Sequence, residues 1–163
     1  MAISKNKKKE VYEKTQGILK DSNSVVFVNF KGLNVSDTTE LRNNLREDSS
    51  AYSVVKKTIV KRALDNFSVK GEMPELEGEL ALAYSKDLIA PARGVYEFQK
   101  KHKEKIAILG GIFEGSFMDR EKMLSIAQIP APQILKGQFV NLINSPIQSF
   151  VIALSKIADK KSE

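Results

Sequence analysis

The chain has 163 residues, which is enough for one domain and an appended segment. It contains no cysteine, which excludes disulfides, thiolate metal sites and a cysteine nucleophile, and its basic N-terminal stretch lacks the apolar run of a secretory signal, so we expect a cytoplasmic protein. Its 26 Lys and Arg against 20 Asp and Glu leave a formal charge of +6, a balance that suits a polyanion such as RNA or DNA.

Helices and short strands are predicted to alternate along the first 129 residues. Helices are expected over 3–20, over 58–67, from Pro91 to about Lys103 and from Met118 to about Ile129. A further helix is expected to begin at a cap formed by Ser36 or Asp37 and to bury Leu41 and Leu45. The helix over 58–67 is expected to bury Ile59, Ala63 and Phe67. Strands are expected over 25–30, 51–55, 79–84 and 106–109, where Gly110-Gly111 lets the backbone bend. This alternation predicts an α+β fold, an α-β sandwich with a small mixed sheet covered by helices, plus an extended C-terminal helix.

The sequence is expected to form a globular part at residues 1–129, a Pro-rich hinge at 130–132 and a terminal helix at 133–163. In the last part, Gln138–Asn144 is echoed eleven residues later by Ser149–Ser155. Eleven residues make almost three turns at 3.6 residues per turn, so the two copies present the same face roughly 16 Å apart. Pro146 lies between the copies and is expected to kink the helix.

The terminal helix is too apolar to remain bare in water. Large apolar side chains lie nearly all round it, which argues against the alternative of a helix that folds one side back onto its own domain. Burying each such side chain is worth about 1.5–3 kcal/mol, so several left exposed on an isolated protein would favour association. We therefore expect another protein to cover this helix.

Candidate catalytic residues are scarce. His102, the single histidine, falls on the inner stripe of a predicted helix and is interpreted as structural. Gly110-Gly111 lacks the third glycine of a dinucleotide fingerprint, and the acidic residues do not form a metal-ligand pattern with a histidine. We expect no enzyme activity, no cofactor and no metal site.

The start of the helix predicted at 58–67 is the best binding candidate in the globular part. Lys56 and Lys57 lie at the positive end of the helix macrodipole, where cations are unfavourable by roughly 0.3–1 kcal/mol each. Lys61 and Arg62 extend the basic surface, and Thr58 can add a hydroxyl contact. Such a cluster makes sense where phosphates approach, because helix N–H groups and lysines bind them together. The alternative is an ordinary solvated face.

Several short motifs, taken in order, resemble the family of bacterial ribosomal stalk-base proteins, the tenth protein of the large subunit. They are Phe27-Val28-Asn29-Phe30-Lys31-Gly32-Leu33-Asn34-Val35, Thr39-Glu40-Leu41-Arg42, Leu45-Arg46-Glu47, Val55-Lys56-Lys57-Thr58-Ile59, Lys61-Arg62-Ala63, Gly110-Gly111, Glu114-Gly115, Ile129-Pro130 and Ala153-Leu154-Ser155-Lys156-Ile157. The resemblance covers almost the whole chain, and the order of the motifs is more specific than any one of them.

The resemblance implies a noncatalytic constituent of the large ribosomal subunit. The globular part would bind large-subunit rRNA beside the neighbouring eleventh protein, at the base of the stalk. The terminal helix would carry dimers of the acidic stalk protein, which recruit GTP-bound translation factors. The implied rRNA-binding residues are Lys31, Gly32, Leu33, Arg42, Lys56, Lys57, Thr58, Lys61 and Arg62. The implied partner-binding residues are Phe139, Val140, Leu142, Ile143, Phe150, Val151, Leu154 and Ile157.

The chain departs from the family pattern in two respects. The family often has an asparagine at the position of Lys57, so here a phosphate contact is expected in place of a specific amide contact. Some members resemble three successive dimer-binding segments, whereas this chain has two, centred on 139–143 and 150–154. We therefore expect two dimers of the acidic stalk protein on the terminal helix.

A second class of function is a peripheral membrane adaptor whose apolar helix lies in a lipid interface while the basic patches meet anionic headgroups. Such a helix interleaves Lys or Arg along its polar face. Between Lys136 and Lys156 the terminal helix has neither, only uncharged polar residues. This composition favours a protein partner, and we expect no membrane association.

Overall fold

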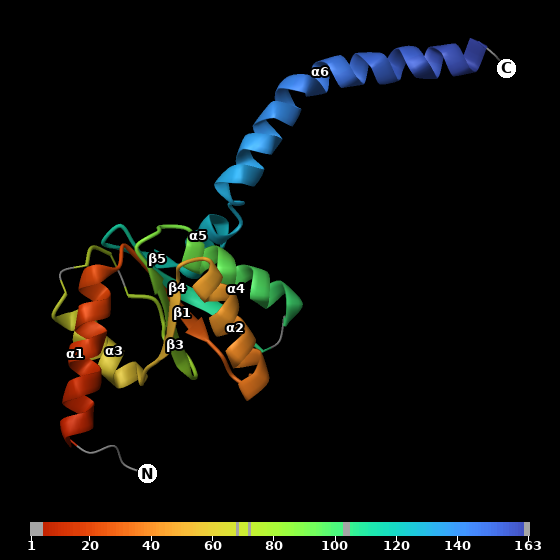
Figure 1. Ribbon diagram of the computed structural model, residues 1–163. Coiled ribbons are helices and arrows are strands. Elements are labelled where there is room, and N and C mark those ends of the chain that lie inside the picture. Colours follow the sequence, from red (N-terminus) through yellow and green to blue (C-terminus); the bar gives the residue numbers. More distant parts are fainter. Residues whose placement is uncertain (1–4, 68, 72, 103–104, 162–163) are drawn as a thin grey trace. The chain divides into compact units, whose positions relative to one another are not determined.

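The computed structural model describes residues 5–67, 69–71, 73–102 and 105–161. The chain divides into two compact units, 1–129 and 130–163. The elements of the first unit are α1 (Lys5–Asp21), β1 (Ser24–Asn29), α2 (Val35–Glu47), β2 (Ala51–Val54), α3 (Lys57–Asp65), β3 (Leu80–Ser85), α4 (Ala90–Lys101), β4 (Ala107–Phe113), β5 (Ser116–Asp119) and α5 (Arg120–Ala127). The second unit holds one helix in its described part, α6 (Pro132–Lys161) (Figure 1).

The five strands form one sheet in the order β2-β3-β1-β4-β5, and every neighbouring pair of these strands is antiparallel. The α+β class is confirmed, although the sheet is antiparallel where the sequence favoured a mixed one. The reason is that helices α2 and α4 each connect two strands of the same direction that do not pair with each other. β3 lies between β1 and β2, and β1 lies between β3 and β4.

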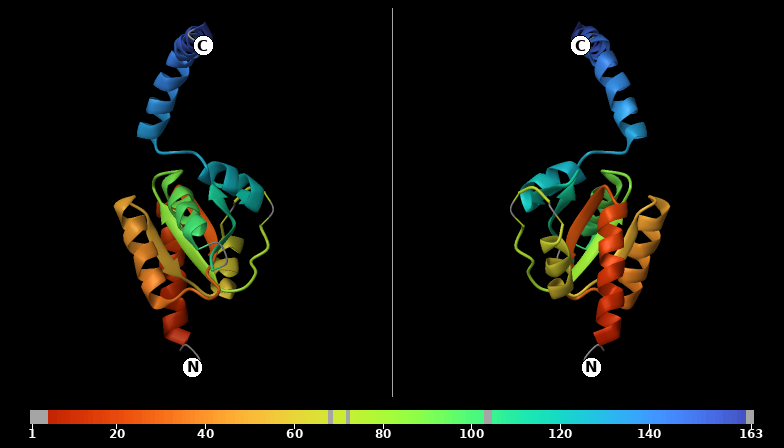
Figure 2. Two further views of the ribbon diagram at one scale, coloured as in Figure 1. Left: turned by 90° about the vertical axis from the view of Figure 1, so that its right-hand side faces the viewer. Right: turned by 90° about the vertical axis from the view of Figure 1, so that its left-hand side faces the viewer.

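Helices cover both faces of the sheet, because β1 is apolar at successive positions. Val25 and Phe27 pack with α1, α3 and the segment between α3 and β3, whereas Val26 and Val28 pack with α2, α4 and α5. This follows from the alternation of side chains along a strand. Figure 1 shows α1 and α3 on one side of the sheet and α2 and α4 on the other, and Figure 2 shows the same layers from two further directions.

Strand β4 continues through the two glycines at which the sequence placed a bend. Phe27 pairs with Gly110 and Val28 with Ile108, so Leu109 is the extra residue of a β-bulge. Gly110 has φ 149°, and at Gly111 a Cβ atom would lie 2.5 Å from the carbonyl oxygen of Val25.

The sequence missed β5, which pairs with β4 across a tight turn. Its signal was Glu114-Gly115, both with positive φ, as a two-residue hairpin turn requires.

Two helix starts differ from the sequence prediction. Helix α2 begins after Asn34, and neither Ser36 nor Asp37 is its cap. The Asp37 carboxylate instead accepts a hydrogen bond from the Lys105 ammonium at 3.1 Å, a partner 68 residues away that local sequence does not reveal. Helix α3 begins at Lys57 and buries Val60, Ala63 and Leu64, so Ile59 and Phe67 are only half-buried.

Helix α6 forms the described part of the second unit. Pro132 is its first residue, where the missing amide hydrogen costs nothing, so the helix includes the last residue of the expected hinge. Pro146 lies inside the helix, and α6 is visibly bent along its length (Figure 1). A proline in a helix removes one backbone hydrogen bond and clashes with the preceding turn, which accounts for a bend of this kind.

Candidate nucleic-acid interface and partner-binding helix

The turn that follows β1 contains the first three implied RNA-binding residues, Lys31, Gly32 and Leu33, and it lies at one end of the sheet. The strand register places Asn29 beside Leu80, and the amide of Val55 donates to the carbonyl of Leu80 at 3.3 Å. The turn that follows β1 and the start of α3 that follows β2 therefore begin at the same end of the sheet. Lys31 and Gly32 are exposed in that turn, which Gly32 permits with φ 86°, whereas Leu33 packs partly against the core.

Helix α3 presents its cations to solvent because its opposite side is buried. Val60, Ala63 and Leu64 face the sheet, which leaves Lys57, Lys61 and Arg62 exposed. Lys56 is the N-cap residue and provides no side-chain cap, while its carbonyl accepts the amides of Ile59 and Val60. The amides of Lys57 and Thr58, at the first two positions of the helix, are therefore without an intrahelical acceptor.

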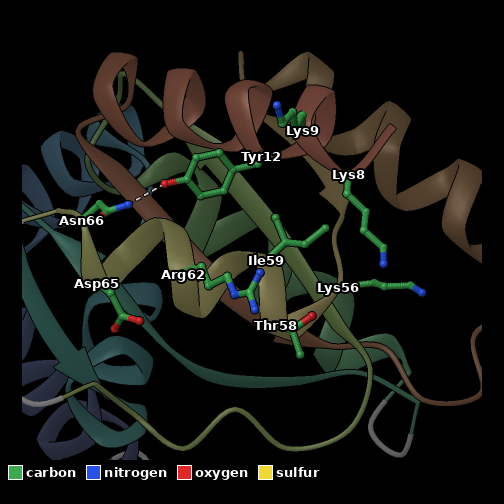
Figure 3. Close-up of a pocket in the computed structure, with 9 residues that line it drawn as sticks. All are labelled: Lys8, Lys9, Tyr12, Lys56, Thr58, Ile59, Arg62, Asp65 and Asn66. Carbon is green, nitrogen blue, oxygen red and sulfur yellow. Dashed lines mark hydrogen bonds between the residues drawn. The ribbon is translucent and has the colours of Figure 1, made fainter. Parts of the chain in front are cut away.

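A groove between α1 and α3 has a volume of about 710 Å³. We call it the α1–α3 groove, and its lining residues are Lys8, Lys9, Tyr12, Lys56, Thr58, Ile59, Arg62, Asp65 and Asn66 (Figure 3). The sequence interpretation missed Lys8, Lys9 and Tyr12 as parts of this surface. The basic run near the N-terminus was its signal, but only the packing of α1 against α3 places that run.

The groove is strongly cationic. Among the described residues, no acidic side chain forms an ion pair with Lys8, Lys9, Lys56 or Arg62, and Asp65 is the one carboxylate on the lining. In Figure 3 the Lys8 side chain extends from α1 towards Lys56, and the Arg62 guanidinium lies beside Ile59 on α3. Unneutralised cations of this kind bind phosphates by releasing the counterions of a nucleic acid.

A second hollow, of about 750 Å³, lies on the other side of Lys56. We call it the β3-side hollow, and it is lined by Phe30, Val54, Val55, Lys56, Lys57, Thr58, Gly78, Glu79 and Leu80. Lys56 and Thr58 thus border both hollows. Phe30 precedes the turn at 31–33, so that turn begins beside the surface formed by the start of α3.

Arg42 does not join this surface. It projects from α2, which covers the opposite face of the sheet from α3, and its guanidinium lies 5.8 Å from the centre of the Tyr52 ring. Burial raises the pKa of the Tyr52 hydroxyl to about 12, although the nearby charge of Arg42 acts in the opposite direction. Arg42 therefore lies within cation–π distance of Tyr52 on the face of the sheet opposite α3.

His102 lies just beyond the end of α4, whereas the sequence placed it on the inner stripe of that helix. The His102 ring stacks on Phe98 with ring centroids 4.5 Å apart. Among the residues that the structure describes, no three His, Asp or Glu side chains lie close enough to hold a metal ion.

Helix α6 exposes every side chain described from Pro132 to Lys160. Twelve of these are large and apolar, with exposed fractions from 41% at Leu135 to 74% at Leu142. They include all the implied partner-binding residues, Phe139, Val140, Leu142, Ile143, Phe150, Val151, Leu154 and Ile157. Over the part of the chain that is described, we find no helix with the length and apolarity needed to cross a membrane.

One side of α6 carries more uncharged polar side chains than the rest of the helix. Gln138, Asn141, Ser145 and Gln148 line one shallow hollow together with Leu142, so they share a face. At about 100° per residue, Phe139, Ile143, Phe150 and Leu154 fall on the other side. The two copies of the repeat therefore form one continuous apolar stripe bordered by uncharged polar residues.

Comparisons with known proteins agree over most of the chain. Residues 3–100 match the family model described as ribosomal protein L10. A large ribosomal subunit protein uL10 from Bacillus licheniformis is 34% identical over 157 residues, which cover 96% of this chain and 94% of that protein. The protein of the same name from Alkaliphilus metalliredigens is 37% identical over 158 residues, with the same coverage of both chains. That from Shouchella clausii is 34% identical over 157 residues, again with the same coverage.

Proposed function

This chain belongs to the ribosomal protein L10 family, and from that premise we propose how its two units act in the large ribosomal subunit. It is a non-enzymatic, structural constituent of that subunit, which is cytoplasmic in bacteria. We propose that the unit of residues 1–129 binds rRNA at the base of the stalk, beside the eleventh large-subunit protein. Helix α6 then anchors dimers of the acidic stalk protein, which recruit GTP-bound translation factors.

The exposed apolar stripe of α6 carries the anchoring proposal. Each large apolar side chain gains roughly 1.5–3 kcal/mol when it passes from full exposure to full burial. Helix α6 as a whole exposes twelve such residues, each by at least 41%, which is far more apolar surface than soluble monomers leave uncovered. An amphipathic helix of this kind fits a hydrophobic groove formed by partner helices.

The first experiment separates the two binding activities. Deleting residues 133–163 removes the stripe and leaves the sheet with its helices intact, so binding of the purified acidic stalk protein should be lost while rRNA binding is retained. Pull-down of the acidic protein and filter binding of large-subunit rRNA measure the two activities on the same preparations. Retention of the acidic protein by the shortened chain would refute the anchoring role of α6.

The RNA-binding proposal is supported by the exposed cations at the start of α3 and along it, which form no ion pair with another residue that the structure describes. Replacing Lys56, Lys57 and Lys61 with alanine should weaken rRNA binding and flatten the slope of log affinity against log salt by about 2 to 3, since each phosphate contact contributes about 0.7–0.9 to that slope. A matched triple variant, Lys20, Lys101 and Lys122 to alanine, removes three exposed charges from other helices. Equal slopes for the two triple variants would place the RNA surface elsewhere.

A further inference from the structure

We propose that the α1–α3 groove receives the sugar–phosphate backbone of the RNA, and that Lys8 and Lys9 of α1 are RNA-contact residues together with Lys56 and Arg62. This inference rests on the proposed RNA-binding function and deepens it. It extends the contact surface from α3 onto a second helix that lies nearly fifty residues earlier in the chain.

The phase of helix α1 turns these two lysines towards α3. The Tyr12 hydroxyl accepts a hydrogen bond from the Asn66 amide nitrogen at 2.6 Å, which joins α1 to the end of α3 (Figure 3). Lys8 and Lys9 precede Tyr12 by four and three residues, so they lie one turn earlier on the same face of α1. Both line the groove as a consequence.

The Tyr12 hydroxyl adds a donor to this surface. Its oxygen accepts the bond from Asn66 and a second one from the Gln16 amide nitrogen at 2.9 Å. A phenol that accepts two hydrogen bonds still has its own proton to donate. Phosphate and ribose oxygens are acceptors of the kind that this proton can bond.

The charges favour the groove over the β3-side hollow for the backbone. The groove has four cationic side chains and the single carboxylate of Asp65 on its lining. The β3-side hollow has only Lys56 and Lys57, together with the carboxylate of Glu79. Because like charges repel and each phosphate is anionic, a backbone that reaches Lys56 is attracted more strongly on the α1 side.

The groove is as large as a typical small-molecule cleft. Its volume of about 710 Å³ lies within the range of roughly 300–1,000 Å³ that is typical of ligand-binding clefts. Most of its lining residues on both helices are exposed, so the groove is open to solvent.

The test compares three double variants of the full-length chain, Lys8 and Lys9, Lys57 and Lys61, or Lys20 and Lys122 replaced by alanine. Each removes two lysine charges, and the last pair is the control because it lies outside both hollows. The probe is large-subunit rRNA purified from Bacillus licheniformis, with excess transfer RNA as competitor. Affinity is measured by filter binding across a range of salt concentrations, after circular dichroism shows that each variant is folded.

We expect the variant at Lys8 and Lys9 to lose about tenfold or more in affinity at ~0.1 M salt, with a salt slope lower by about 1.5 to 2. Its loss should equal or exceed that of the variant at Lys57 and Lys61, whereas the control should bind like the unchanged chain. If Lys57 and Lys61 matter and the variant at Lys8 and Lys9 matches the control, this inference is overturned and the proposed function stands. If no variant differs from the unchanged chain, the RNA-binding proposal itself fails.

A second measurement does not depend on substitutions. Lysines of the unchanged protein are acylated with and without the rRNA, and the modified positions are quantified by mass spectrometry. Protection of Lys8 and Lys9 together with Lys56, but not of Lys20 and Lys122, supports the groove. Full reactivity of Lys8 and Lys9 in the complex would contradict it.

Discussion

Replacing Phe139 or Phe150 with alanine should weaken the binding of one dimer of the acidic stalk protein in each case. The two rings occupy equivalent positions in the repeat, eleven residues apart, and fall within about 20° of each other around the helix. Each variant should therefore leave the other segment functional. The double variant should weaken both segments.

The size of the effect follows from the exposure of the two rings. Phe139 is 65% exposed and Phe150 is 64% exposed. Covering about two thirds of a phenylalanine side chain contributes roughly 1–2 kcal/mol out of the 1.5–3 kcal/mol for complete burial. Each substitution is thus expected to raise the Kd at its own segment by about 5–30-fold.

Isothermal titration calorimetry with the purified acidic protein measures the two sites, and native mass spectrometry of the co-expressed complex counts the copies. We expect four copies of the acidic protein on the unchanged chain. Ile152 offers a matched control because it is 54% exposed but lies about 200° around α6 from Phe150. Ile152→Ala should therefore change neither the affinity nor the count.

Two outcomes would refute this reasoning. A complex with six copies would show that α6 contains a third binding segment. Equal losses from Ile152→Ala and Phe150→Ala would show that the apolar stripe does not decide where the partner binds.

Further predictions concern stability. Gly111→Ala should lower the free energy of unfolding by about 1–3 kcal/mol in urea denaturation, because its Cβ would meet the Met123 side chain and, at 2.5 Å, the Val25 carbonyl oxygen. Gly17→Ala in α1 should raise that free energy by about 0.5–1 kcal/mol, since nothing lies within 4 Å of the new methyl group, and a loss there would contradict the helix assignment. The Lys105 ammonium holds the pKa of Asp37 in the folded chain below its ordinary value of 3.8. The ion pair between them therefore stabilises the fold fully above that pH, and this stabilisation is lost as the pH falls through the pKa of Asp37 in the folded chain. The stability difference between the unchanged chain and Asp37→Asn should therefore be present at about pH 6 and shrink below about pH 3.8; a constant difference would show that the ion pair is not its cause.

Local patterns in the sequence predicted the types of most secondary-structure elements. They failed where the residue that makes the deciding contact lies far away in the sequence. Asp37 looked like a helix cap because its sequence context suits one, yet the structure commits it to Lys105. The phase of α3 was displaced by one residue because Ile59, Val60 and Ala63 are all apolar, and only contact with the sheet decides which of them is buried.

The candidate site shows the same division. The cations of α3 could be recognised because they lie close together in the sequence. The twelve exposed apolar side chains of α6 could be recognised as a surface that another protein is expected to cover. Arg42 was grouped with the α3 cations because the resemblance compares motifs in their order along the sequence and does not show where they lie in space. The structure separates them, since α2 and α3 cover opposite faces of the sheet.

The amino-acid sequence by itself determined the basic balance, the succession of helices and strands and the repeated apolar helix, because each is a property of neighbouring residues. The tertiary structure decided which strands pair, which face each helix covers and which lysines share a groove. These depend on the burial of apolar faces against one another. In a folded chain, such contacts join residues as distant as Tyr12 and Asn66.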